Sequence, residues 1–579
     1  MPSKPLLLLS AALLLVLPLV AEAQQAPRTR QAPATSLGGR YLAARVAEQD
    51  HDYERGSDQL DMALALAPRD PELIYSAFRM RIYAGRIESA AQLAPAVLTA
   101  KPGDGFANLV LMIQHIKRGD NRAAEQQFGR IGAENQFGPL RDHVAAWLKA
   151  GQKDFVAARE LLAKMRAASG SRGEAPSPII EAQIDELAGD LAPAEEKYRR
   201  ALQLDPTTLR TTVAVGEGLR RLGLNDEARA LFTAYGEKYV DSVVMDGLTA
   251  PNAPAPKPPT AASGIAEILF DIGGALSADP RNQRTDLALI FLQMATELKP
   301  DLDFGWLTLG GLYEQFQAPA KAVSVLGKIS PTSPVSWQAR LRMAALDAQE
   351  DRLEPAIARL RALVAEKPAR IDAALTLADL LRSKERYADS VAAYNVAVQR
   401  LQKVEERHWV VFFGRGIVLE RTKQWLKAEA DMKKALELSP DQPYLLNYLG
   451  YSWVDQGQNL EAGMKMLKRA TELRPDDGAI SDSVGWAYYR TGQFDKAVEW
   501  LEKASEQKGD DATIVEHLGD TYWQVGRRRE ARFQWERALN QKPDTDRVPI
   551  IKDKISNGLN ATNDKPTVYE KPGEKKQGG

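Results

Sequence analysis

The residue types that carry most enzyme chemistry are present in this chain but scattered. The five histidines lie far apart: His51, His115, His143, His408 and His517. None lies at metal-ligand spacing from another, there is no H-E-x-x-H, and the chain has no cysteine. Metal sites, disulfides and cysteine nucleophiles need such clusters. The sequence therefore predicts no metal and no covalent thiol chemistry.

Glycine motifs that bind phosphate or expose a nucleophile are also missing. Gly327-Lys328 lacks the upstream glycine of a P-loop, and Gly414-Arg415-Gly416 does not open a strand–helix unit. No G-x-S-x-G is present. Paired carboxylates occur throughout, on predicted solvated helix faces where charge is the usual state. These observations predict a protein that is not an enzyme and has no cofactor.

The charge of the chain is balanced, with 76 basic and 77 acidic residues. No net field draws it toward nucleic acid or an anionic membrane, so we expect neither as a partner. The apolar fraction of 44% is sufficient for a continuous core. The elements that would position any binding residues must therefore be sought in the pattern along the chain.

The N-terminus has the layout of a cleavable secretory signal. Lys4 precedes the 15-residue apolar run Leu6 to Val20, and Ala21-Glu22-Ala23 supplies small residues before Gln24. A retained membrane anchor is the alternative, but the run is shorter than the ~20 residues that span a bilayer. We expect a signal peptide at 1–23, a disordered segment at 24–36 and a periplasmic protein of a Gram-negative bacterium. Because there is no lipid-modified cysteine, no direct membrane anchor is expected after cleavage.

A repeat of about 34 residues fills most of the remaining sequence. The window that begins at Ala512 has Gly519, Tyr522, Ala531 and Trp535, and equivalent small residues recur upstream. Those equivalents are Gly485, Gly450, Gly416, Ala378, Ala344 and Gly310. Small residues let antiparallel helices approach closely, and a helix pair buries its apolar face only by stacking on neighbours. The pattern matches the tetratricopeptide signature. It predicts an all-α fold, a right-handed solenoid of about 14 helix pairs, some of them degenerate.

One interruption divides the predicted solenoid. Residues 249–263 are rich in proline and alanine and are predicted to be extended, either as an interdomain linker or as a loop inside one superhelix. The N-terminal degenerate solenoid would then cover 37–248 and the C-terminal solenoid 264–543, with an irregular loop near Asp279 to Arg284. A cap helix is expected at 544–560 and a disordered tail at 561–579.

The concave face of the C-terminal repeats is the predicted partner-binding groove. Aromatic residues edged by charge fall at the inward window positions, and such residues anchor peptides. The predicted site residues are Arg382, Phe413, Arg421, Tyr444, Asn447, Tyr451, Trp486, Tyr489, Arg490, Asp520 and Trp523. The alternative is that Trp486 and Trp523 pack between adjacent pairs. Asp482 and Glu516 occupy places where a clamp for a C-terminal carboxylate needs Asn or Lys, so that ligand is not favoured.

An arginine run lies at the predicted turn between the last two helices of the repeat array. Arg527, Arg528, Arg529 and Arg532 form either a solvated turn or a docking patch for an acidic partner.

The last repeats carry a more specific likeness. The strings NYLGYSWVDQG, DSVGWAYYRTGQFDKAVEWLEKA and HLGDTYWQVGRRREARFQWERAL occur between Pro443 and Leu539. This stretch, about a fifth of the chain, resembles a proteobacterial family of exported tetratricopeptide proteins that includes lipoprotein adaptors of periplasmic carboxyl-terminal processing proteases. The resemblance implies an adaptor that holds a protease and its cell-wall-hydrolase substrates. The absent lipobox cysteine departs from it.

Two functions therefore stand. The first is a periplasmic protein-binding scaffold or adaptor, and the alternative is a structural component of a polysaccharide-secretion or outer-membrane assembly complex. The partner and the oligomeric state are left open by the sequence.

Overall fold

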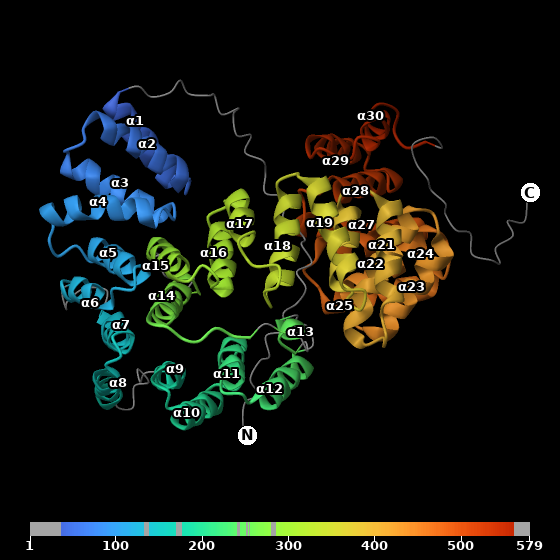
Figure 1. The fold of residues 1–579 in the computed structure, drawn as a ribbon. Helices are drawn as coiled ribbons and strands as arrows, with labels where there is room; N and C mark the ends of the chain where they lie inside the picture. Colours follow the sequence, from blue (N-terminus) through green and yellow to red (C-terminus); the bar gives the residue numbers. More distant parts are fainter. Residues whose placement is uncertain are drawn as a thin grey trace, which may run out of the picture. The chain divides into compact units, whose positions relative to one another are not determined.

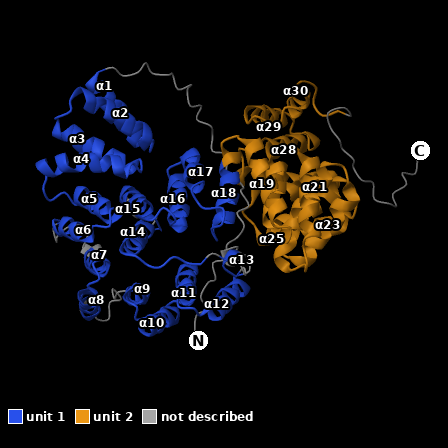
Figure 2. Cartoon of the chain, viewed as in Figure 1, with its two compact units in different colours: residues 1–346 blue, residues 347–579 orange. Residues whose placement is uncertain are grey.

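The computed structural model describes residues 36–131, 138–169, 177–239, 244–249, 253, 255–278 and 285–560. The signal peptide expected at 1–23, the segment at 24–36 except Ser36, the loop near Asp279 to Arg284 and the tail at 561–579 lie outside these ranges. The chain forms two compact units, residues 1–346 and 347–579 (Figure 2). Each is described by itself below.

Unit 1 is built from helices in antiparallel pairs (Figure 1). They are α1 (Leu37–Gln49), α2 (Tyr53–Leu66), α3 (Pro71–Tyr83), α4 (Ile87–Ala100), α5 (Gly105–Lys117), α6 (Asn121–Gly129), α7 (Gly138–Gly151), α8 (Phe155–Ser169), α9 (Pro178–Ala188), α10 (Leu191–Leu204), α11 (Leu209–Arg221), α12 (Asn225–Lys238), the short α13 (Val244–Thr249), α14 (Ala261–Ala278), α15 (Thr285–Leu298), α16 (Asp303–Gln315) and α17 (Pro319–Leu326). The boundary between the units falls within α18 (Ser336–Gln349).

Unit 2 continues the same pairing. Its helices are α19 (Leu353–Glu366), α20 (Asp372–Ser383), α21 (Tyr387–Gln399), the 3-10 turn η1 (Glu406–His408), α22 (Trp409–Arg421), α23 (Trp425–Leu438), α24 (Pro443–Asp455), α25 (Leu460–Leu473), α26 (Gly478–Arg490), α27 (Phe494–Gln507), α28 (Ala512–Gln524), α29 (Arg528–Asn540) and α30 (Arg547–Asn557). Thirteen packed helix pairs and no β-strand are found in the described ranges. The predicted all-α solenoid is confirmed.

Local chemistry sets where these helices begin, turn and cross. The Asp477 side chain accepts the N–H groups of Ala479 and Ile480 and so caps the start of α26. Gly492, at φ 72°, makes the turn into α27. At the crossing of α24 and α25 a Cβ on Gly450 would lie 2.9 Å from the Gly463 carbonyl oxygen, so only glycine lets the helices approach this closely. The repeat signature thus marks caps, turns and crossings.

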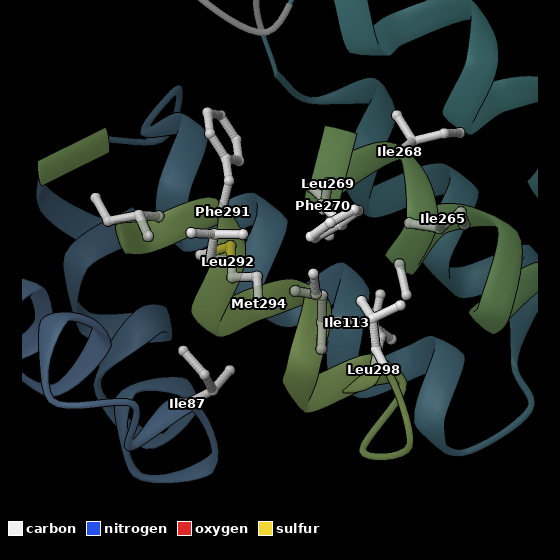
Figure 3. Close-up of a cluster of buried hydrophobic side chains, with 14 of the residues drawn as sticks. Ile87, Ile113, Ile265, Ile268, Leu269, Phe270, Phe291, Leu292, Met294 and Leu298 are labelled. Atoms are coloured by element: carbon white, nitrogen blue, oxygen red, sulfur yellow. The ribbon is translucent and has the colours of Figure 1, made fainter. Parts of the chain in front are cut away.

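In unit 1 the pair α14–α15 packs against earlier helices instead of only its neighbours in sequence. α14 contacts α5 and α7, and α15 contacts α3, α4 and α5. Buried side chains from both segments, among them Ile113, Ile265 and Phe291, belong to one apolar core (Figure 3). Gly264 lies directly against the ring of the buried Trp147, where a Cβ would meet the indole at 2.0 Å. The chain therefore doubles back and fills this face of its own solenoid.

This packing explains a difference from the predicted domain boundary. The segment at 249–263 was expected to be either an interdomain linker or a loop inside one superhelix; residues on both of its sides belong to unit 1, and the division falls between Leu346 and Asp347. The reason is the burial of α14 and α15 against α3, α5 and α7. Pro256, Pro258 and Pro259 still keep residues 255–260 free of helix, and α14 starts at Ala261.

Among the described residues, α14 is the one helix long and apolar enough to cross a membrane. Its apolar residues include Ile265, Leu269 and Phe270, which are buried in the core of unit 1. The packing described above accounts for its composition.

In unit 2 the first helices of successive pairs approach one another. α20 contacts α22, α24 contacts α26, and α26 contacts α28. In a curved stack the helices on the inside of the curve lie closest together. We call the surface formed by α20, α22, α24, α26 and α28 the inner face. α30, which lies within residues 544–560, packs on α29.

Candidate partner-binding face

All predicted site residues lie on helices of the inner face, but their surroundings differ. Arg382 is on α20, Phe413 and Arg421 on α22, and Tyr444, Asn447 and Tyr451 on α24. Trp486, Tyr489 and Arg490 are on α26, and Asp520 and Trp523 on α28. The residues of α26 and α28 are largely engaged within the protein, whereas those of α20, α22 and α24 leave polar and aromatic surface available.

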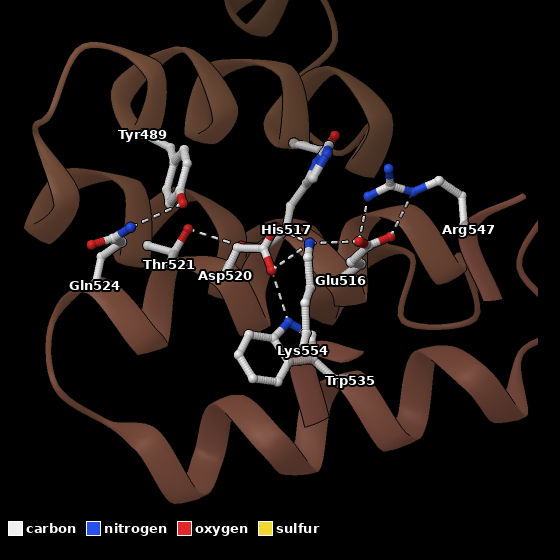
Figure 4. Close-up of polar contacts among 10 residues, drawn as sticks. Tyr489, Glu516, His517, Asp520, Thr521, Gln524, Trp535, Arg547 and Lys554 are labelled. Atoms are coloured by element: carbon white, nitrogen blue, oxygen red, sulfur yellow. Dashed lines mark hydrogen bonds and ion pairs between the residues drawn. The ribbon is translucent and has the colours of Figure 1, made fainter. Parts of the chain in front are cut away.

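A ladder of polar contacts joins successive repeats on the inner face. Arg490 forms an ion pair with Asp455 and also donates to its backbone carbonyl at 2.9 Å. The same 35-residue step joins Asp482 to His517, at 2.9 Å, and Gln524 to the Tyr489 hydroxyl, at 3.3 Å (Figure 4). Arg490 and Tyr489 are buried by these contacts. They hold the repeats together, so a ligand does not meet them directly.

Trp486 is sandwiched between two rings. Its indole stacks on Tyr489 with centroids 4.7 Å apart and on His517 with centroids 3.9 Å apart. The buried indole Nε1 has no hydrogen-bond partner in the part of the chain that the structure describes. The Trp486 ring therefore packs between repeats, which was the alternative to partner binding. Its indole N–H, however, is not used in a hydrogen bond within the described residues.

The far end of the inner face is closed by α30. Lys554 Nζ lies 2.7 Å from Glu516 Oε1 and 2.7 Å from Asp520 Oδ2, and all three side chains are buried (Figure 4). Arg547 also pairs with Glu516, and the Trp535 indole donates to Asp520 at 2.8 Å. Burial opposes the charge of Glu516, but Lys554 and Arg547 hold its pKa below the ordinary value. Asp520 is therefore a partner of the cap helix rather than a free groove residue.

His517 sits between the ladder and this closed end. Burial lowers the pKa of its imidazole, but Asp482, Glu516 and Asp520 together outweigh burial and hold that pKa above its ordinary value. Sequence analysis did not select His517 or Lys554. The available signal was Glu516 and Asp520, two carboxylates four residues apart on one helix face, which require a cation when buried.

The last predicted aromatic, Trp523, is covered as well. It lies 5.5 Å from the Trp535 ring, Gly558 packs against it, and the guanidinium groups of Arg528 and Arg532 lie over it. Arg532 further donates to the Ile555 carbonyl at 3.0 Å. Arg528 and Arg532 on α29 therefore contact Trp523 on α28, and Arg532 also contacts α30.

The open part of the inner face lies over α20, α22 and α24. Tyr444 is 40% exposed, and the side chain of Arg421 is 58% exposed. Asn447 Oδ1 and Arg382 Nε are buried but have no hydrogen-bond partner within the described residues. Phe413 contacts Tyr448 edge to face, with centroids 5.7 Å apart. This surface combines aromatic rings with unused donors and acceptors, as peptide-binding surfaces do.

Other locations in the described residues are weaker candidates for a partner-binding site. A pocket of about 610 Å³ in unit 1 is lined by Lys117, Arg86 and Trp306, among others. Of the cations that line it, Lys117 pairs with Glu88 and Glu297 and Arg86 pairs with Asp58, whereas Lys328 lies over the Trp306 ring. The described ranges contain no group of three or more His, Asp or Glu that could hold a metal ion.

Sequence comparison agrees with the repeat architecture. The family model for the TPR, or tetratricopeptide, repeat matches residues 485–526, which span the Trp486 stack and the whole of α28. The chain therefore contains a TPR repeat at these residues, and its fold is an all-α solenoid of the TPR type. A TPR repeat-containing protein of Pseudomonas aeruginosa is 28% identical over 197 residues, covering 34% of this chain and 32% of that protein. The match thus spans about a third of the length of this relative.

Solved TPR structures are similar to parts of the chain. YrrB, described as a TPR protein with an unusual peptide-binding site, is 22% identical with a TM-score of 0.26, covering 34% of this chain and 97% of its own. A chain of the APC/C hetero-tetramer Cut9–Hcn1 is 14% identical with a TM-score of 0.36, covering 91% and 97%.

Proposed function

We propose that this chain is a non-catalytic scaffold that binds a protein partner on the inner face of unit 2, over α20, α22 and α24. TPR repeats are protein-interaction modules, and in this chain the remainder of the inner face is engaged by the inter-repeat ladder and by α30. The open part is bounded on one side by Arg382 and on the other by Tyr451.

The observation that carries this proposal is the state of Asn447. Its Oδ1 is buried without a hydrogen-bond partner, although a buried unsatisfied polar atom destabilises a fold by about 1–3 kcal/mol. Tyr444 and Tyr451 lie one turn away on either side, on the same face of α24. If the Asn447 side chain rotates toward the inner face, a peptide N–H can donate to Oδ1 and remove this penalty, with the peptide side chains against the two tyrosines.

We place the scaffold in the bacterial periplasm, as an adaptor for a carboxyl-terminal processing protease and its substrates. The support is the secretory layout of residues 1–23 and the resemblance of the last repeats to exported adaptor proteins. Because there is no lipobox cysteine, recruitment to a membrane would depend on the partner.

Site-specific photo-crosslinking in the native bacterium tests both parts. A photoreactive phenylalanine replaces Tyr444 on the open inner face or, as control, Phe533, which is 63% exposed on α29. We expect a periplasmic processing protease to crosslink at 444 and not at 533. A crosslink only at 533 contradicts the inner-face assignment. Crosslinks at 444 to subunits of a secretion or outer-membrane assembly complex would replace the adaptor role with the structural one.

A further inference from the structure

The packing of α15 against α3, α4 and α5 leaves the cavity of about 610 Å³ in unit 1. Its wall is assembled from segments that are distant in sequence: residues 85–89, 117, 293, 296–298, 300, 306 and 328. Ile87 and Leu298, both labelled in Figure 3, belong to its apolar part. Small-molecule sites commonly have volumes of about 300–1,000 Å³ and lie where separate elements meet. The doubling back of the chain thus creates a cavity of the size that a small ligand needs.

One cation of the wall, Lys328, has no anionic partner. Its ammonium lies over the Trp306 ring, 4.3 Å from the centroid, and makes neither a hydrogen bond nor an ion pair within the described residues. The other two cations, Lys117 and Arg86, pair with carboxylates. Partial burial and the nearby Lys321 lower the pKa of the Lys328 ammonium. A bound anion would offset both effects.

The same wall contains the N-terminus of α4. Arg86, the N-cap residue, gives the first N–H groups of the helix no side-chain acceptor, and Glu88 and Ser89 of the first turn line the cavity. The partial positive charge of a helix N-terminus favours a carboxylate, as the Lys328 ammonium does. One end of the ligand is therefore expected to be a carboxylate.

A buried acceptor supplies the second requirement. Gln293 is only 6% exposed, and its Nε2 donates to the Tyr313 hydroxyl at 3.0 Å and to the Tyr83 carbonyl at 3.5 Å. Its Oε1 lies beside Gly85 of the wall, 2.7 Å from where a Cβ would be, and accepts no hydrogen bond in the part of the chain that the structure describes. A carbonyl oxygen in such a place requires an N–H or O–H donor.

The charges of the wall narrow the ligand further. Glu88 and Glu297 line the cavity beside Gln293, so a positively charged donor is favoured there over a neutral one. The same carboxylates would repel a phosphate dianion, and a neutral sugar would leave Lys328 without a counter-charge. A zwitterion that carries a carboxylate and an ammonium group satisfies both ends.

We propose that this cavity binds a free α-amino acid, with its carboxylate at Lys328 and the N-terminus of α4 and its ammonium at Gln293 Oε1. The site belongs to unit 1 and is independent of partner binding on unit 2. A scaffold of this kind has a small-molecule site in addition to its protein-binding face.

The test begins with the full chain and the twenty common L-amino acids. A ligand that binds only the folded protein raises its unfolding temperature, so each amino acid is screened by thermal shift and each hit is titrated by calorimetry. Each hit is compared with its carboxamide and with the acid that lacks the amino group. We expect at least one amino acid to bind and both analogues to bind about tenfold more weakly. If no amino acid binds, or if an analogue binds equally tightly, the inference is wrong.

Lys328→Met assigns the carboxylate end. It removes the ammonium but keeps an apolar side chain over Trp306, and it should bind the amino acid no more tightly than the carboxamide. Lys321→Met is the matched control, because Lys321 also lies over a ring, that of Tyr313, but does not line the cavity. It should keep the tenfold preference. An unchanged preference in Lys328→Met overturns the assignment.

Ser89→Phe tests the cavity itself. A phenyl ring at this position of the wall should abolish amino-acid binding, and circular dichroism of the unliganded variant checks that it folds. Retained binding in folded Ser89→Phe places the amino acid elsewhere and overturns the inference. If this variant does not fold, the analogues and Lys328→Met still decide the outcome.

Discussion

The imidazole of His517 lies flat against the indole of Trp486, with centroids 3.9 Å apart and planes inclined by 16°. On its edge Nδ1 lies 2.9 Å from Asp482 Oδ1, so the ring is held by a stack and by a carboxylate at once. A protonated imidazole in this position gains from both contacts. The last repeats are therefore joined by an imidazole whose pKa is held above its ordinary value.

The first prediction concerns the pH dependence of this junction. The pKa of His517 is above its ordinary value of 6.5 in the folded protein. Its stabilising contribution is thus complete below that ordinary value and is lost as pH rises through the folded-state pKa. The free energy of unfolding lost in His517→Gln should be larger at about pH 5.5 than at about pH 8.5 in urea titrations of the full chain. An equal loss at both pH values would contradict the charged state, and Asp482→Asn should reduce the dependence similarly.

The second prediction concerns the cation under the cap. Lys554→Met leaves Glu516 and Asp520 buried without their shared ammonium, and removing one partner of a buried ion pair destabilises by about 3–5 kcal/mol. We expect this loss in the unfolding transition of unit 2. Lys552→Met, on the exposed side of the same helix, serves as control and should change stability by no more than about 0.5 kcal/mol. Equal effects of the two variants would show that α30 is not held by these contacts.

The third prediction separates packing from binding on the inner face. Trp486→Ala removes a ring stacked on two neighbours and should destabilise unit 2 by about 2–4 kcal/mol. Tyr444→Ala removes an exposed ring and should alter stability by less than about 0.5 kcal/mol while weakening partner binding. Thermal unfolding reports the change in stability, and the fluorescence anisotropy of a labelled partner peptide reports the change in binding. Loss of stability in Tyr444→Ala would mean that this ring, too, is structural.

The fourth prediction tests the packing of α14 in unit 1. Gly264→Ala places a methyl group where the ring of Trp147 lies, and overpacking of this kind destabilises by about 1–3 kcal/mol. Gly274→Ala, on the same helix with open space around it, should be neutral or stabilising by up to about 1 kcal/mol. Calorimetry of both variants provides the comparison. Equal destabilisation by Gly264→Ala and Gly274→Ala would contradict the contact with Trp147 as the cause.

The sequence predicted the repeat fold well because its determinants are local. Gly450, Gly485 and Gly519 mark helix crossings that recur at nearly constant spacing, and each repeat contacts mainly its neighbours. The packing of α14–α15 on α3, α5 and α7 was not predicted, because it depends on contacts between distant segments that no period records. The division at Leu346 could not be read from 249–263 for the same reason.

The sequence predicted where the inner face lies, but not which of its side chains are engaged by other residues of the chain. Window position places Tyr489, Arg490 and Asp520 toward the inside, and the structure does so too. Position does not reveal that Gln524, Asp455 and Lys554 already satisfy them, since each partner comes from another repeat or from the cap. Arg421 and Asn447 lack such partners, and only the structure distinguishes them.

The doubling back of α14–α15 gives unit 1 a different kind of cooperativity. Gln293 on α15 donates to the Tyr83 carbonyl on α3 at 3.5 Å, and Lys117 is joined to Glu297 across 180 residues of sequence. Closing such long loops slows folding, and it also means that no early repeat is stable without the later hairpin. A typical repeat array can be shortened one repeat at a time with a graded loss of stability. Unit 1 should instead lose its structure in one step when either end of this contact is removed.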